Sequence, residues 1–199
     1  GLSETTSIEI PGGSHVVINS ATAPIIYSKG GSILRQIEGY VGETQFQTAL
    51  QRFLDANAYG CAGSTDLWDT METESGKPVR HIMAGWITQP GHPLVSVQRS
   101  GQKLALTQQR FTYLPSAAPH DQTWPIPVSI RLYEENGRIR EQHFIFDGPE
   151  AQIDIGDAVR AYKVNAMQTG FYRVWYQDWQ NLQRLGDMIA AGDLPEIDP

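Results

Sequence analysis

The chain has 199 residues, enough for one large domain or two ordinary ones, and its 40% hydrophobic content is sufficient for buried cores. Its net charge is −7 and its basic residues are scattered, which argues against a nucleic-acid binder. The sequence has no apolar run of about 20 residues, so no membrane segment is expected. Cys61, the sole cysteine, excludes an internal disulfide and favours a reducing, cytoplasmic location.

In the first half of the chain, apolar residues recur with the spacing typical of helices. Residues 1 to 20 predict an irregular lead-in or a short strand around Ile8 and Ile10. Apolar residues then recur on one helical face up to Gly42, and a second helix is predicted between Glu43 and Ala58. A third helix is expected with Ser64 as its N-cap, followed by a fourth. The fourth helix carries Val79, Ile82, Met83, Trp86 and Ile87.

After Pro93 the period changes to the alternation of β-strands. A hairpin is predicted with its turn at Ser100-Gly101, and a second with its turn at Glu135-Asn136-Gly137. Shorter strands are expected around residues 153–155, 162–165 and 171–176. About seven strands favour a β-sandwich of two antiparallel sheets, and a terminal helix is expected from Asp178.

Tyr27 is the first candidate for chemistry, because it places an aromatic hydroxyl just ahead of a predicted helix. A phenol ionises near pH 10, so at neutral pH it can donate a hydrogen bond to a developing oxyanion. The ordinary alternative is a tyrosine packed at a helix start with its hydroxyl bonded to backbone.

Several blocks of the sequence agree in order with one enzyme family. They resemble the gluzincin aminopeptidases, which include the alanyl, puromycin-sensitive and endoplasmic-reticulum aminopeptidases. The resemblance covers about residues 24 to 190. The blocks are Tyr27-Ser28-Lys29-Gly30, Gly42-Glu43 to Phe46, Leu50 to Phe53, Asp66-Leu67-Trp68, Ser75 to Val79, Trp86 to Pro93 and Gln168 to Val174.

The resemblance implies a multidomain architecture. Residues 1–93 would be the helical back half of a thermolysin-like catalytic domain, and residues 94–177 an antiparallel, immunoglobulin-like β-sandwich. Residues 178–199 would form the first helix of a C-terminal helical domain. An antibody-type domain itself is disfavoured, because no Cys-Trp-Cys core is present.

The resemblance also implies an activity. Family members use zinc and a Glu to activate water and remove single residues from peptide N-termini, and a tyrosine that matches Tyr27 binds the oxyanion. The zinc motif His-Glu-x-x-His is absent from these 199 residues. The chain is therefore expected to be a fragment that is inactive alone, with peptide substrates and the remaining domains of its parent as partners.

Two other functions stay open: a noncatalytic module that binds a protein or peptide, and a family relative that also hydrolyses a lipid epoxide. No other residues predict a different chemistry. The histidines, which include His15, His81 and His92, are interpreted as structural. The acidic residues around Asp66 and Glu72 fit a solvated helix face better than a glycosidase pair. The aromatics Trp175, Tyr176 and Trp179 predict a hydrophobic seam between domains, whereas Trp124 is ambiguous.

Overall fold

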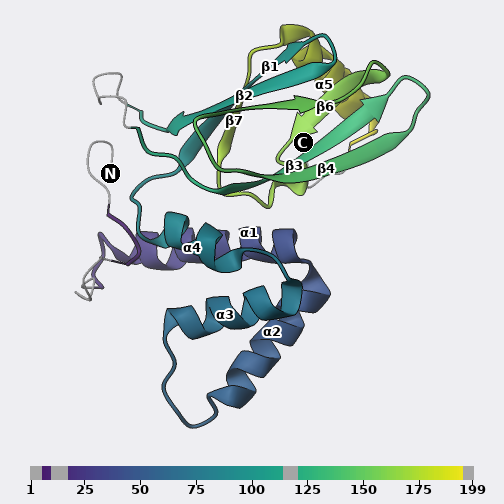
Figure 1. The fold of residues 1–199 in the computed structure, drawn as a ribbon. Helices are drawn as coiled ribbons and strands as arrows, with labels where there is room; N and C mark the ends of the chain where they lie inside the picture. Colours follow the sequence, from purple (N-terminus) through teal and green to yellow (C-terminus); the bar gives the residue numbers. More distant parts are fainter. Residues whose placement is uncertain (1–5, 10–17, 114–120, 195–199) are drawn as a thin grey trace. The chain divides into compact units, whose positions relative to one another are not determined.

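A computed structural model describes residues 6–9, 18–113 and 121–194 (Figure 1). The chain forms two compact units, one from Thr6 to Pro90 and one that begins at Gly91. We call them the helical unit and the two-sheet unit. The prediction for Ile10 and the interpretation of two of the histidines, His15 and His120, lie outside the described residues. Within the described ranges, no helix has both the length and the apolar character needed to cross a membrane.

The helical unit confirms the four predicted helices. A π-helical turn, η1 (Pro24–Lys29), runs directly into α1 (Gly30–Val41), which is followed by α2 (Glu43–Ala56), α3 (Ser64–Ser75) and α4 (Val79–Ile87). The helices pack through the apolar stripes that the periodicity predicted. The fully or nearly fully buried side chains of this core include Ile33, Ile37, Met71, Val79, Ile82, Met83 and Trp86.

Two helix boundaries differ from the prediction. The N-cap of α3 is Gly63 and not Ser64, because the Asp66 carboxylate accepts the Gly63 backbone N–H at 2.8 Å. The hydroxyl of Ser64 donates instead to Glu9 at 2.7 Å. Tyr27 lies inside the helical turn η1 and not ahead of the helix, so η1 and α1 form one continuous helical segment.

The two-sheet unit has seven strands in the described residues. They are β1 (Pro93–Ser100), β2 (Lys103–Arg110), β3 (Ile126–Glu134), β4 (Ile139–Phe146), β5 (Glu150–Asp154), β6 (Val159–Val164) and β7 (Arg173–Tyr176). One sheet has the order β5-β2-β1-β7 and the other β4-β3-β6. Both predicted hairpins, β1-β2 and β3-β4, are confirmed. The structure is thus a mixed α and β fold with two mostly antiparallel sheets.

The expectation of purely antiparallel sheets is wrong at one place. Strands β1 and β7 are parallel, with Leu94 opposite Arg173 and Val97 opposite Tyr176. A parallel pair needs a long connection between its strands, and here the rest of the unit supplies it. The immunoglobulin-like topology stays a prediction.

Buried polar groups link the two sheets. Gln108 on β2 accepts the backbone N–H of Trp124 at 2.9 Å and donates to the carbonyls of Trp124 and Gly148 at 3.1 and 2.7 Å. Trp124, ambiguous from the sequence, is fully buried. The Arg99 guanidinium on β1 donates to the Val159 carbonyl on β6 at 2.7 Å. These hydrogen bonds give partners to backbone groups within and beside the strands.

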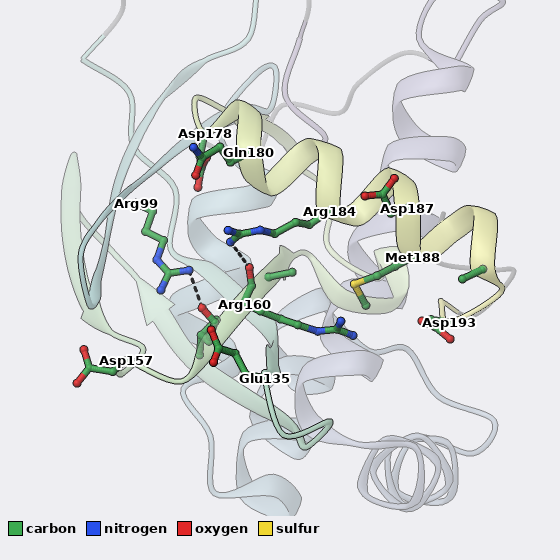
Figure 2. A pocket seen from close by; sticks show the side chains of 13 residues that line it. Arg99, Glu135, Asp157, Arg160, Asp178, Gln180, Arg184, Asp187, Met188 and Asp193 are labelled. Atoms are coloured by element: carbon green, nitrogen blue, oxygen red, sulfur yellow. Dashed lines mark hydrogen bonds between the residues drawn. The ribbon is translucent and has the colours of Figure 1, made fainter.

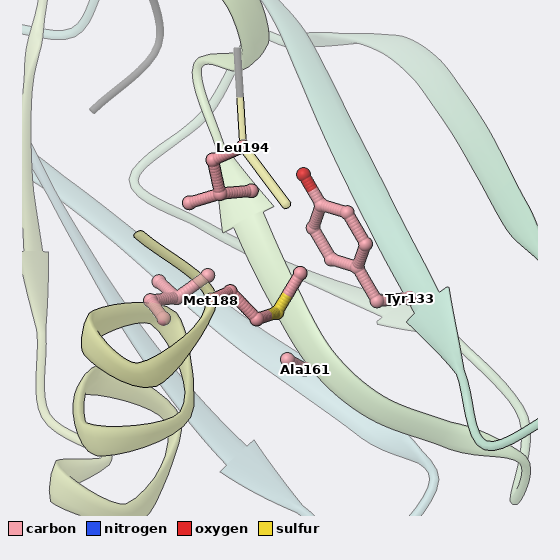
Figure 3. Close-up of a cluster of buried hydrophobic side chains, with 5 residues drawn as sticks. Tyr133, Ala161, Met188 and Leu194 are labelled. Carbon is pink, nitrogen blue, oxygen red and sulfur yellow. The ribbon is translucent and has the colours of Figure 1, made fainter. Parts of the chain in front are cut away.

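The terminal helix α5 (Trp179–Ala191) packs on the two-sheet unit (Figure 3). Its buried residues Leu185 and Met188 form a hydrophobic cluster with Tyr133, Ala161 and Leu194. The Asn181 side chain, one helical turn before Leu185, accepts the Tyr162 N–H and donates to the Tyr162 carbonyl, both at 2.9 Å. The side chain therefore pairs with the edge of β6 as a neighbouring strand would. That α5 also begins a further domain stays a prediction.

Candidate functional site

Tyr27 lies in the middle of η1, which follows a turn that is held by the Asn19 side chain. The Asn19 side chain accepts the backbone N–H groups of Ala21 and Thr22 at 2.9 and 3.2 Å. Pro24 opens η1, where its missing N–H costs nothing. The wide π-helical turn is a form that occurs mostly in single turns and frequently at functional sites.

The Tyr27 side chain is 67% exposed, and the described residues give its hydroxyl no hydrogen-bond partner. The alternative interpretation, a packed tyrosine with its hydroxyl bonded to backbone, is therefore wrong for the described part of the chain. Two tyrosines of the two-sheet unit, Tyr162 and Tyr172, are buried instead, and burial raises the pKa of both phenols. In the helical unit Tyr27 shares its exposure with Tyr59, but only Tyr27 lies in the block that matches the family pattern.

Lys29, two residues after Tyr27, is only 8% exposed. Its ammonium donates to the Gln89 backbone carbonyl at 2.7 Å, across sixty residues of sequence. The sequence interpretation missed this residue. A signal was present, because Lys29 stands four and eight positions before the buried Ile33 and Ile37 and so continues the apolar face of α1.

The histidines of the described residues do not form a metal site. His81 is exposed on α4, His92 stacks on Phe111 with ring centroids 5.2 Å apart, and His143 lies 3.4 Å from Glu141. In the described ranges, no group of three or more His, Cys, Asp or Glu residues could hold a metal ion.

The acidic residues of α3 hold neighbouring helices. Asp69 pairs with Arg80 at 2.5 Å, and Glu72 accepts the Arg80 backbone N–H at 2.9 Å. Glu74 pairs with Arg52 on α2. These contacts give the carboxylates structural partners on α2 and α4, so they do not form a glycosidase pair.

One hollow on the two-sheet unit has a volume of about 700 Å³ and a charged lining (Figure 2). Three arginines, Arg99, Arg160 and Arg184, lie among five acidic side chains. Arg99 and Arg184 already donate to the backbone carbonyls of Val159 and Arg160. Charges of both signs that are engaged in this way give the hollow no preference for an anion or a cation.

A second hollow, of about 680 Å³, lies between β7 and α5 and is mainly apolar. Trp175 lines it and is 55% exposed, and Trp179 nearby in sequence is 68% exposed. Tyr176 differs: it is half-buried, and its hydroxyl accepts the Val164 N–H at 2.8 Å. Of the three aromatic residues predicted to form a seam between domains, the two tryptophans are exposed. Tyr176 instead packs within the two-sheet unit.

Comparison with known proteins identifies the family. The family model described as "Peptidase family M1 domain" matches residues 2–86. The chain is 38% identical over 177 residues to "Tricorn protease-interacting factor F2" of Thermoplasma volcanium, covering 89% of this chain and 21% of that protein. It is 38% identical to "Probable aminopeptidase 2" of Sulfurisphaera tokodaii, covering 89% and 22% respectively. For "Leucyl aminopeptidase" of Saccharolobus solfataricus the identity is 35%, covering 87% and 20%.

The class that these matches define is that of the metallopeptidases. The chain belongs to peptidase family M1, the gluzincin aminopeptidases, as the sequence resemblance predicted. The chain spans about a fifth of the length of the curated relatives it matches.

Proposed function

We propose that this chain is part of a zinc-dependent aminopeptidase that removes N-terminal residues from peptides, and that Tyr27 is its transition-state hydrogen-bond donor. The observation that carries the proposal is the exposed Tyr27 hydroxyl on a helical turn of a family M1 segment. The match of Tyr27-Ser28-Lys29-Gly30 to the family pattern supports the same assignment.

The chemistry of peptide hydrolysis explains why a tyrosine would be needed. Attack of water on the scissile carbonyl moves negative charge onto its oxygen, and a neutral phenol can donate a hydrogen bond to that oxygen. This bond becomes stronger as the charge develops, so it lowers the barrier more than it stabilises bound substrate. Loss of one such donor typically costs about 2.7 to 4 kcal/mol of transition-state stabilisation.

Zinc is the cofactor that the family generally uses, but the described residues do not fit it, because they contain no cluster of ligands. We therefore assign the metal and the general base to other segments of the full-length protein, and derive no step through the metal. The 199-residue chain by itself would then be inactive.

The domain assignment of residues 1–93, 94–177 and 178–199 forms part of the proposal. The hollow beside the exposed Trp175 would be covered by another domain of the same polypeptide. A cytoplasmic location is proposed as well, since Cys61 is an exposed, free thiol of the kind that persists in a reducing compartment.

The activity can be tested on the full-length protein with matched peptides that have a free or an acetylated N-terminus. We expect release of single residues from the free peptide only, loss of turnover with a chelator, and recovery on addition of zinc. Cleavage of both peptides at internal bonds, or turnover that resists the chelator, would reject the proposal.

A further inference from the structure

The Lys29 ammonium is the most deeply buried charge near Tyr27. It lies at the junction of η1 and α1, where its Nζ donates to the Gln89 carbonyl at 2.7 Å. A buried ammonium without an acceptor would be strongly destabilising, so this hydrogen bond fixes the position of the side chain. The end of the helical turn that carries Tyr27 is thereby tied to the residues that follow α4.

The acceptor is itself held in place. The Gln89 side chain donates to the Gly85 carbonyl at 2.9 Å, which folds residue 89 back on the end of α4. Helix α4 is anchored in the core by Ile82 and Trp86, both fully buried. The Gln89 carbonyl is therefore a fixed reference point within the helical unit.

Helical geometry links the positions of Lys29 and Tyr27. Tyr27 and Lys29 are two residues apart in a π-helical turn, so their side chains lie on roughly opposite sides of the helix axis. Lys29 shares the buried face with Ile33 and Ile37, and Tyr27 is directed to solvent. The N-cap residue of η1, Ala23, makes no side-chain capping bond that could fix this rotation.

We infer that Lys29 is a positioning residue, whose hydrogen bond to the Gln89 carbonyl sets the rotation of η1 and hence the direction of the Tyr27 hydroxyl. The inference rests on the proposed role of Tyr27. It adds a residue that does not meet the substrate but determines where the oxyanion donor lies. A displacement of about 1 Å at a reacting group can cost about a hundredfold in rate.

The test is a double-mutant cycle in the full-length protein, with the variants Lys29→Met, Tyr27→Phe and both together. Lys29→Met keeps the length of the side chain and removes the donor. We expect kcat to fall at least about tenfold in Lys29→Met with KM changed less than about threefold, and the double variant to match Tyr27→Phe alone. Lys77→Met is the matched control, because the Lys77 ammonium also donates to a backbone carbonyl, that of Tyr40, away from η1.

The possible outcomes separate the two claims. If Tyr27→Phe has normal kcat, the proposed function of Tyr27 fails and the role of Lys29 fails with it. If Tyr27→Phe is slow but Lys29→Met has normal kcat, only the inference is overturned. If Lys29→Met lowers kcat by the same factor in the Tyr27→Phe background as in the unmodified protein, Lys29 has a general structural role and the inference is overturned. The same conclusion follows if Lys77→Met lowers kcat as much as Lys29→Met does. Should Lys29→Met not fold, Lys29→Leu, which also lacks a donor, is carried through the same cycle with the same criteria.

Discussion

Replacement of Asn181 by Leu tests whether α5 is an integral part of the two-sheet unit. The Asn181 side chain is 1% exposed and makes two hydrogen bonds of 2.9 Å with the Tyr162 backbone. Leu has a similar size but leaves both backbone groups buried without these partners. Each such group costs about 1 to 3 kcal/mol, so for the two groups we expect a loss of about 2 to 6 kcal/mol.

Hydrogen exchange at the Tyr162 amide measures this loss directly. A global unfolding curve would mix the two compact units, whereas one assigned amide reports its own unit. Since 1.4 kcal/mol corresponds to a factor of ten, exchange should become at least about 30-fold faster in Asn181→Leu. The exposed neighbour Gln180 provides the control, and Gln180→Ala should leave the rate within about threefold.

The variant Asn181→Asp adds a pH dependence to the same test. A carboxylate can accept the Tyr162 N–H but cannot donate to its carbonyl, whereas a protonated carboxyl can do both. Burial would raise the pKa of this carboxyl above its value in the unfolded chain, about 3.9. The variant should therefore be most stable at acidic pH and lose stability as pH rises through the raised pKa. Normal exchange in Asn181→Leu at neutral pH would refute the pairing of α5 with β6.

Three further predictions follow from other parts of the chain. The isolated 199-residue chain should not cleave peptides with added zinc, and chelator-sensitive turnover would contradict this. Gly170→Ala should lower the free energy of unfolding by about 1 to 3 kcal/mol, because its new Cβ would lie 2.2 Å from the Tyr172 ring. Hydrogen exchange at amides of the two-sheet unit measures this loss. The control Gly186→Ala, in open space on α5, should be neutral or stabilising. The hydrogen bond from Arg140 lowers the pKa of Glu134, so the stabilisation by this pair is present at neutral pH and is lost as the pH falls through that lowered pKa. Glu134→Gln should therefore weaken the dependence of the free energy of unfolding on pH in the acidic range. An unchanged dependence would exclude this pair as its cause.

Local patterns predicted most of the fold correctly. The helical period fixed α1 to α4 within two residues, and the alternation around Ser100-Gly101 and Asn136-Gly137 predicted both hairpins. The parallel pairing of β1 with β7 could not be predicted in this way. Leu94 and Arg173 are far apart in the chain, and the period of a strand does not specify its partner.

The candidate site likewise has features that the sequence predicted and features that depend on tertiary structure. Family resemblance nominated Tyr27, but its direction depends on the phase of a π-helical turn, which no propensity scale predicts. The burial of Lys29 was encoded in its spacing from Ile33 and Ile37, although a lysine at that position is more easily taken for a solvated residue. The Gln89 carbonyl that receives its ammonium depends on tertiary packing and could only be found in the structure.

The kinetics of Tyr27→Phe in the full-length protein test the central claim most directly. The substitution removes one hydroxyl from an exposed side chain, so the fold and the metal content should be unchanged. The account predicts that kcat on a free-amine peptide falls by about a hundredfold to a thousandfold, while KM changes by less than about threefold. An unchanged kcat, or a loss confined to KM, would contradict it.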